Sequence, residues 1–114
     1  MAPAPTDRRR FLVGSAALLA GGSVTWALLK LQRPGSPLGD ADVARRIGAR
    51  HAARYPDAAA ELWQEGPPQD EEAWLARVAA LRRADFEADR LVEVEGWWLA
   101  ETELRLCVLL HETT

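Results

Sequence analysis

The pattern of apolar and polar residues divides the chain into an apolar N-terminal segment, a short break and a longer amphipathic part. Residues 11–29 carry no charged side chain. As a helix they would extend about 28 Å, close to the ~30 Å hydrocarbon thickness of a bilayer. Proline and glycine are concentrated in residues 31–40, which predicts a flexible linker. We therefore expect a targeting or transmembrane helix in residues 1–30 and a small acidic folded domain in residues 41–114.

Helical periodicity, with apolar residues recurring every three or four positions, predicts three helices in the first part of this domain. An aspartate precedes or begins each of them, and its carboxylate can accept hydrogen bonds from the free amides of the first turn. Proline or glycine ends the first two helices. The predicted helices are residues 41–55 after Asp40 or Asp42, residues 58–65 after Asp57, and residues 70–91 with Asp70 at the start.

The period changes towards the end of the chain. Residues 91–95 alternate apolar and charged side chains as a strand does, and Gly96 supplies a turn before Trp97 and Trp98. A last helix from Ala100 is apolar on most sides, which is typical of a helix buried in a core or in a partner's groove. The fold expected after the N-terminal helix and linker is therefore mainly α: a bundle of three to four helices, with a short strand or hairpin before the last one.

The residues before the apolar segment resemble an export signal. Arg8 and Arg9 form a consecutive pair, and Arg10 is followed by Phe11 and Leu12. This arrangement resembles the twin-arginine signal of bacterial and archaeal export, in which a variable residue and then Phe-Leu follow the arginine pair. The resemblance implies recognition by the twin-arginine (Tat) export machinery. It also implies a location in the periplasm or on the periplasmic face of the inner membrane.

Two alternatives remain open for the N-terminal segment. An ordinary signal anchor, whose arginines stay inside by the positive-inside rule, would give the same orientation. The segment could also be cleaved, because small residues precede Ser23 and, less favourably, Leu28. If it is not cleaved, residues 11–29 would hold the protein in the membrane.

The C-terminal end combines a Gly-Trp turn, a Thr-Glu pair and a Leu-Cys pair. The residues concerned are Gly96, Trp97, Leu99, Thr102, Glu103, Leu106 and Cys107. They resemble the close of a group of small bacterial proteins that carry twin-arginine signals and have no assigned activity. In that group a serine is expected at Ala100, where it would cap the last helix while Glu103 reached back as in a capping box. The resemblance implies a location and a fold, and no mechanism.

Charge and motif content exclude several functions. The net charge is −3, and the +2 of residues 1–22 leaves −5 for the remainder. Nucleic-acid binding needs a basic surface, so no nucleic-acid partner is expected. No phosphate-binding loop, nucleophile elbow or paired metal motif is present in the sequence, and we expect a non-catalytic protein without a cofactor or metal. A set of carboxylates is better explained by a helix cap and solvated faces: Asp70, Glu71, Glu72, Asp85 and Glu87.

Two features leave alternatives open. Cys107, the only cysteine, is expected to be an inert buried thiol in an apolar helix. The alternative is that it acts with His111, which lies four residues later on the same helix face, as a reactive thiol or as part of a metal site. Trp97 and Trp98 would point to opposite sides of a strand. Either both tryptophans contribute to the core, or one of them faces outward and anchors an interface. We expect an exported accessory or small subunit that docks onto a periplasmic partner such as an oxidoreductase. The alternative is a stand-alone, membrane-tethered helical module.

Overall fold

The structure, a computed structural model, describes residues 16–33, 36–64 and 66–113. Its elements are α2 (Ala16–Leu31), the 3-10 turn η2 (Pro37–Gly39), α3 (Ala41–His51), the 3-10 turn η3 (Ala52–Arg54), α4 (Ala58–Leu62), α5 (Glu71–Glu87), β1 (Leu91–Val94), β2 (Trp97–Ala100) and α6 (Glu101–Thr113). The expectation of a mainly α fold with a hairpin before the last helix is confirmed. Among the described residues, no helix has both the length and the apolar character needed to cross a membrane.

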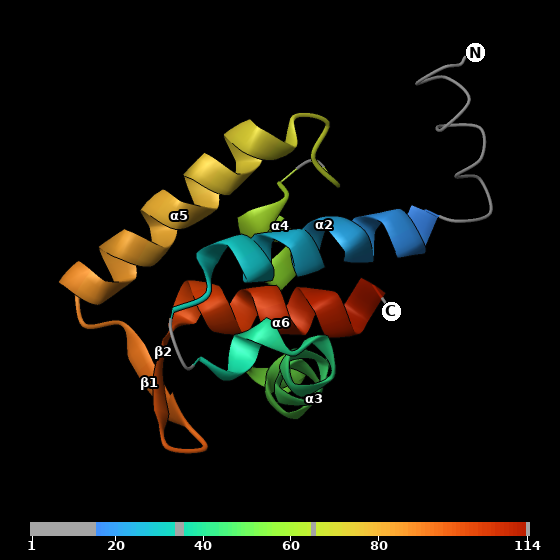
Figure 1. Ribbon diagram of the computed structural model, residues 1–114. Helices are drawn as coiled ribbons and strands as arrows, with labels where there is room; N and C mark the ends of the chain where they lie inside the picture. Colours follow the sequence, from blue (N-terminus) through green and yellow to red (C-terminus); the bar gives the residue numbers. More distant parts are fainter. Residues whose placement is uncertain (1–15, 34–35, 65, 114) are drawn as a thin grey trace, which may run out of the picture.

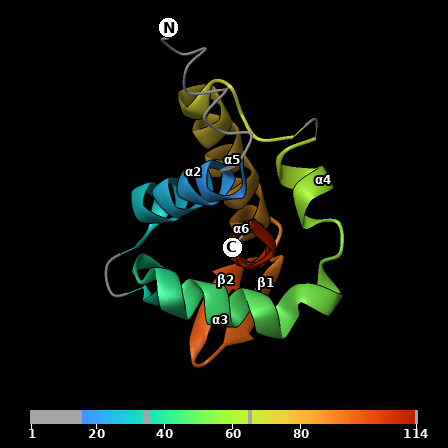
Figure 2. The same ribbon diagram turned by 90° about the vertical axis from the view of Figure 1, so that its right-hand side faces the viewer.

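Helix α6 lies at the centre of the described part, and α2, α3, α4 and α5 pack around it (Figures 1 and 2). Most of its residues are buried: Thr102, Glu103, Leu104, Leu106, Cys107, Val108, Leu109 and Leu110. A helix that is apolar on most sides needs neighbours on most sides, and here the chain supplies them itself. The core is therefore organised along α6.

Helices α3 and α6 cross in close backbone contact at Gly48. A Cβ atom added to Gly48 would lie 1.9 Å from the carbonyl oxygen of Cys107. That oxygen belongs to the backbone of a buried helix, so it cannot move aside as a flexible side chain would. The absence of a side chain at Gly48 therefore sets the distance between the two helices.

The core extends further towards the N-terminus than the sequence pattern indicates. Val24, Ala27 and Leu28 of α2 are buried against the rest of the core, and Leu38 of η2 is buried as well. Their spacing along α2 is that of one helical stripe, as packing against an intramolecular core requires. Residues 36–40 also have a defined conformation, because the Ser36 hydroxyl accepts a hydrogen bond from the Leu38 amide.

The helix boundaries agree with the predicted caps at two of three places. Asp40 accepts from the amides of Asp42 and Val43, and Asp70 accepts from the amide of Ala73 at 3.0 Å. The predicted cap at Asp57 was wrong, because its side chain makes no capping hydrogen bond. Its carboxylate instead lies 3.7 Å from the guanidinium of Arg105 on α6. Helix α5 also ends at Glu87, earlier than the apolar pattern predicts.

Replacing Gly48 with alanine should destabilise the fold strongly. Overpacking a core typically costs about 1–3 kcal/mol, and a clash between two helix backbones should lie at the upper end. The free energy of unfolding, followed by tryptophan fluorescence in denaturant, measures the effect. An exposed helical Gly→Ala change normally stabilises by about 1 kcal/mol, so an unchanged or raised stability would contradict the close crossing.

Candidate interaction site

The hairpin of β1 and β2 presents two tryptophans. Val94 pairs with Trp97 and Glu93 pairs with Trp98, so the two indoles lie on opposite faces of the hairpin. Trp98 is 56% exposed and Trp97 is 36% exposed. Figure 1 shows the hairpin at the lower left, where the chain leaves α5, and Figure 2 shows it beside α3. The sequence left open whether both tryptophans serve the core or one anchors an interface, and in the structure both are exposed, Trp98 more than Trp97.

The hairpin turn is short and is held against α3. Glu95 and Gly96 both have positive φ angles, of 52° and 87°, as a type I′ turn requires. The carboxylate of Glu95 accepts hydrogen bonds from Arg46 at 2.9 Å and from Arg50 at 3.2 Å. Each exposed ion pair contributes at most about 1 kcal/mol, but together they fix the turn to a helix. The tryptophans are therefore presented by a hairpin with a defined orientation.

Asp85 joins α5 to the start of α6. Its side chain is buried, and one carboxylate oxygen accepts hydrogen bonds from the Thr102 amide at 2.7 Å and the Thr102 hydroxyl at 2.6 Å. The other oxygen accepts from Arg90 at 2.9 Å. The interpretation of Asp85 as part of a solvated face was therefore wrong. A buried carboxylate needs donors, and the free amides at a helix N-terminus supply them.

Glu103 completes the N-terminus of α6 from within the helix. Its buried carboxylate accepts from the Ala100 amide at 2.8 Å, which is the reach-back predicted for a capping box. The serine expected at Ala100 is absent, and Asp85 accepts from a first-turn amide in its place. The cap is thus divided between α5 and α6.

Arg33 connects this cap to the hairpin and to α5. Its guanidinium donates to the Glu103 carboxylate at 3.1 Å and to the backbone oxygen of Trp98 at 3.1 Å. It also lies over the ring of Phe86, 5.2 Å from the ring centre. Arg82 of α5 lies 3.6 Å from the other oxygen of Glu103 and donates to the Leu31 carbonyl. The chain at the end of α2, the hairpin and α5 therefore meet at one buried carboxylate.

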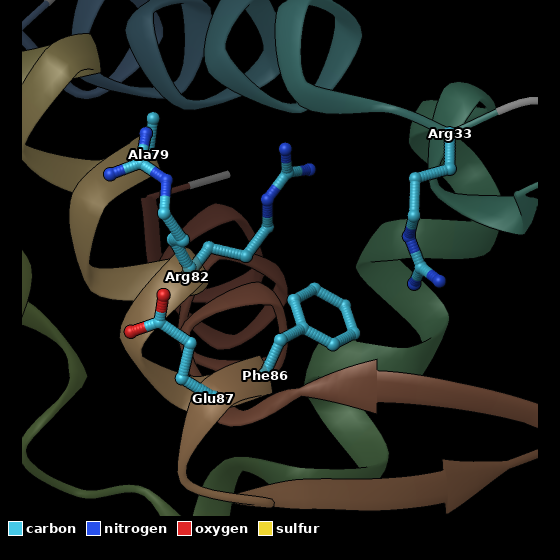
Figure 3. Close-up of a pocket in the computed structure, with 6 residues that line it drawn as sticks. Arg33, Ala79, Arg82, Phe86 and Glu87 are labelled. Carbon is cyan, nitrogen blue, oxygen red and sulfur yellow. The ribbon is translucent and has the colours of Figure 1, made fainter.

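A cleft of about 350 Å³ opens beside this junction. Figure 3 shows Arg33 approaching from the segment after α2, while Ala79, Arg82, Phe86 and Glu87 come from α5. Arg83 completes the lining. Nothing in the sequence predicts the contact between Arg33 and α5, because it joins residues far apart in the chain.

Cys107 and His111 do not form a shared accessible site. Cys107 is fully buried, as the sequence predicts, whereas His111 is exposed. Burial, and secondarily the charge of Glu103, raises the pKa of the Cys107 thiol to about 12. The thiolate needed for nucleophilic or metal chemistry is therefore strongly disfavoured in the folded protein. In the part of the chain that the structure describes, no three His, Cys, Asp or Glu side chains cluster as a metal site would require.

The predicted targeting residues Arg8, Arg9, Phe11 and Leu12 lie outside the described residues. Comparisons of the chain with protein-family models, with curated proteins and with solved structures found no match. The candidate site therefore consists of the two exposed tryptophans, the junction at Arg33 and the adjoining cleft.

Replacing Asp85 with asparagine should lower the free energy of unfolding by about 1–3 kcal/mol, because three donors face the carboxylate and an amide group would oppose at least one of them. Chemical denaturation followed by tryptophan fluorescence measures the change. Asp89→Asn is the matched control, since Asp89 is exposed and asparagine adopts its positive φ equally well. Equal denaturation midpoints for both variants would argue against a structural role for Asp85.

Cys107 should resist alkylation by iodoacetamide at pH 8 in the folded protein and react fully once the protein is unfolded. Burial blocks access, and the raised pKa keeps the thiol protonated. Intact-mass measurement follows the reaction. An Ala49→Cys variant, which adds a thiol on the exposed side of α3, should gain one label while folded. Labelling of Cys107 at a similar rate would show that α6 is not buried as described.

Proposed function

We propose that this protein is an exported, non-catalytic accessory or small subunit that docks onto a periplasmic partner through its hairpin. The observation that carries the docking role is the exposure of Trp98 and Trp97 on a hairpin fixed by Glu95 and α3. Tryptophan is enriched at interface hot spots because its large ring loses little conformational freedom on binding. A pre-oriented anchor lowers the ordering cost of association.

The packing of the hairpin supports a binding role over a purely structural one. Val94 and Leu99, on the inner face of the hairpin, are buried and complete its contact with the helices. Trp98 projects from the opposite face, beside the exposed Glu93 on the neighbouring strand. The core is thus closed without Trp98, whose apolar surface is available to a partner.

Export through the twin-arginine route is proposed from the sequence alone. Arg8 and Arg9, with Phe11 and Leu12 in register, support it. That route carries folded proteins, including cofactor enzymes and the small subunits that travel with them. A periplasmic oxidoreductase is therefore the first class of partner that we expect.

The docking role is tested with the full chain, recovered from its natural host after cross-linking, with both the partner and the mature N-terminus identified by mass spectrometry. Trp98→Ala should weaken the affinity of the purified pair by about tenfold or more, as hot-spot tryptophans do. Leu29→Ala is the control, since Leu29 is also exposed but lies on α2. Recovery of no partner, with a monodisperse protein and an intact N-terminus, would instead favour the stand-alone membrane-tethered module.

The export route is tested by replacing Arg8 and Arg9 with lysine, which keeps the charge and removes the arginine pair. We expect the variant to remain in the cytoplasm, because the twin-arginine machinery reads the pair itself. Cell fractionation with immunoblotting measures the distribution, and Arg10→Lys is the matched control at the variable position. Unchanged export of the double variant would assign the segment to the general secretory route.

A further inference from the structure

The cleft between Arg33 and α5 has the charge and shape of a carboxylate site. Its lining contains the guanidinium groups of Arg33, Arg82 and Arg83 but only one carboxylate, that of Glu87. Glu103, below Arg33 and Arg82, is already bound to both of them and to a backbone amide. One positive charge therefore remains uncompensated within the cleft and its floor.

One arginine of the cleft also has no acceptor within the described part of the chain. Arg83 is exposed and, among the described residues, takes part in no hydrogen bond or ion pair. Guanidinium groups bind carboxylates well because their planar fork matches the two carboxylate oxygens. Phe86 orients Arg33 by lying against its guanidinium group.

The cleft adjoins the proposed docking surface directly. Arg33 lines the cleft and at the same time binds the backbone oxygen of Trp98. A partner in contact with Trp98 therefore has Arg33 within reach on one side, and the exposed Glu93 lies opposite Trp98 on β1. Arginine and tryptophan together form the composition typical of an interface hot spot.

We infer that the cleft binds an acidic side chain of the protein partner, next to the apolar contact that the partner makes with Trp98. We build this inference on the proposed docking function, and it names the chemistry of the segment that docks: a carboxylate flanked by apolar residues. An anionic membrane surface fits less well, because it presents negative charge to a whole face of a chain that carries −5 beyond residue 22. A single acidic side chain meets mainly the local positive charge of the cleft, since more distant charges are screened beyond a Debye length of about 10 Å.

The probe is the peptide acetyl-Leu-Glu-Glu-Leu-amide, titrated into the full chain while the Arg Nε–H and Trp indole signals are followed by NMR. We expect the signals of Arg33 and Trp98 to shift, and the peptide with glutamine in place of glutamate to bind at least about five-fold more weakly, as loss of a charge-assisted contact predicts. Added salt should weaken the binding of the acidic peptide and leave the binding of the neutral peptide unchanged.

Arg83→Gln is the test variant, because Arg83 makes no hydrogen bond or ion pair with the residues that the structure describes. It should weaken binding of the acidic peptide about five-fold or more, with the neutral peptide unaffected. Arg54→Gln, an exposed arginine remote from the cleft, should change the affinity less than two-fold. Equal binding of both peptides, or of the acidic peptide to Arg83→Gln and to the unchanged protein, would overturn the inference.

Two further outcomes separate this inference from the docking function itself. Binding to phosphatidylglycerol vesicles that depends on Arg83, without binding of the acidic peptide, would assign the cleft to lipid headgroups and overturn the protein-partner inference. If Trp98→Ala weakens the native complex while Arg83→Gln does not, docking stands and the carboxylate site is excluded.

Discussion

The buried N-terminus of α6 is the constraint on which the rest of the structure depends. A helix in the centre of a core exposes its first amides to other protein atoms instead of water, and each unpaired amide there would cost about 1–3 kcal/mol. Asp85 and Glu103 meet this requirement from two different helices. Their charges must then be compensated in turn, and Arg90, Arg33 and Arg82 do so. These five ionic groups follow from the burial of one helix end.

This arrangement couples the cap to the surface. Arg33 compensates Glu103 and also fixes the outer edge of β2 at Trp98, so one side chain links the cap to the proposed interface. Glu95 holds the other end of the hairpin to α3, and Gly48 allows α3 to lie close to α6. The exposed tryptophans are therefore supported by the same contacts that stabilise the core.

Local patterns in the sequence predict much of this fold. Alternation in residues 91–95 with Gly96 predicts the hairpin, Asp40 and Asp70 predict helix starts, and the apolar last helix predicts its own burial. The contacts of Asp85 and Arg33 could not be predicted in this way. A carboxylate on α5 is expected to face solvent unless another helix end packs against it. The periodicity of α5 alone does not predict which element packs against Asp85.

The burial of Val24, Ala27 and Leu28 has a consequence for the order of events in the proposed export. The same side chains cannot lie in a bilayer or a translocase and in the core at one time. Each large apolar side chain withdrawn from the core costs about 1.5–3 kcal/mol, against a total stability of about 5–15 kcal/mol for a typical domain. If the segment acts as a signal, α2 would be withdrawn from an otherwise folded chain during transport, and docking of α2 after release would complete the core on the far side of the membrane.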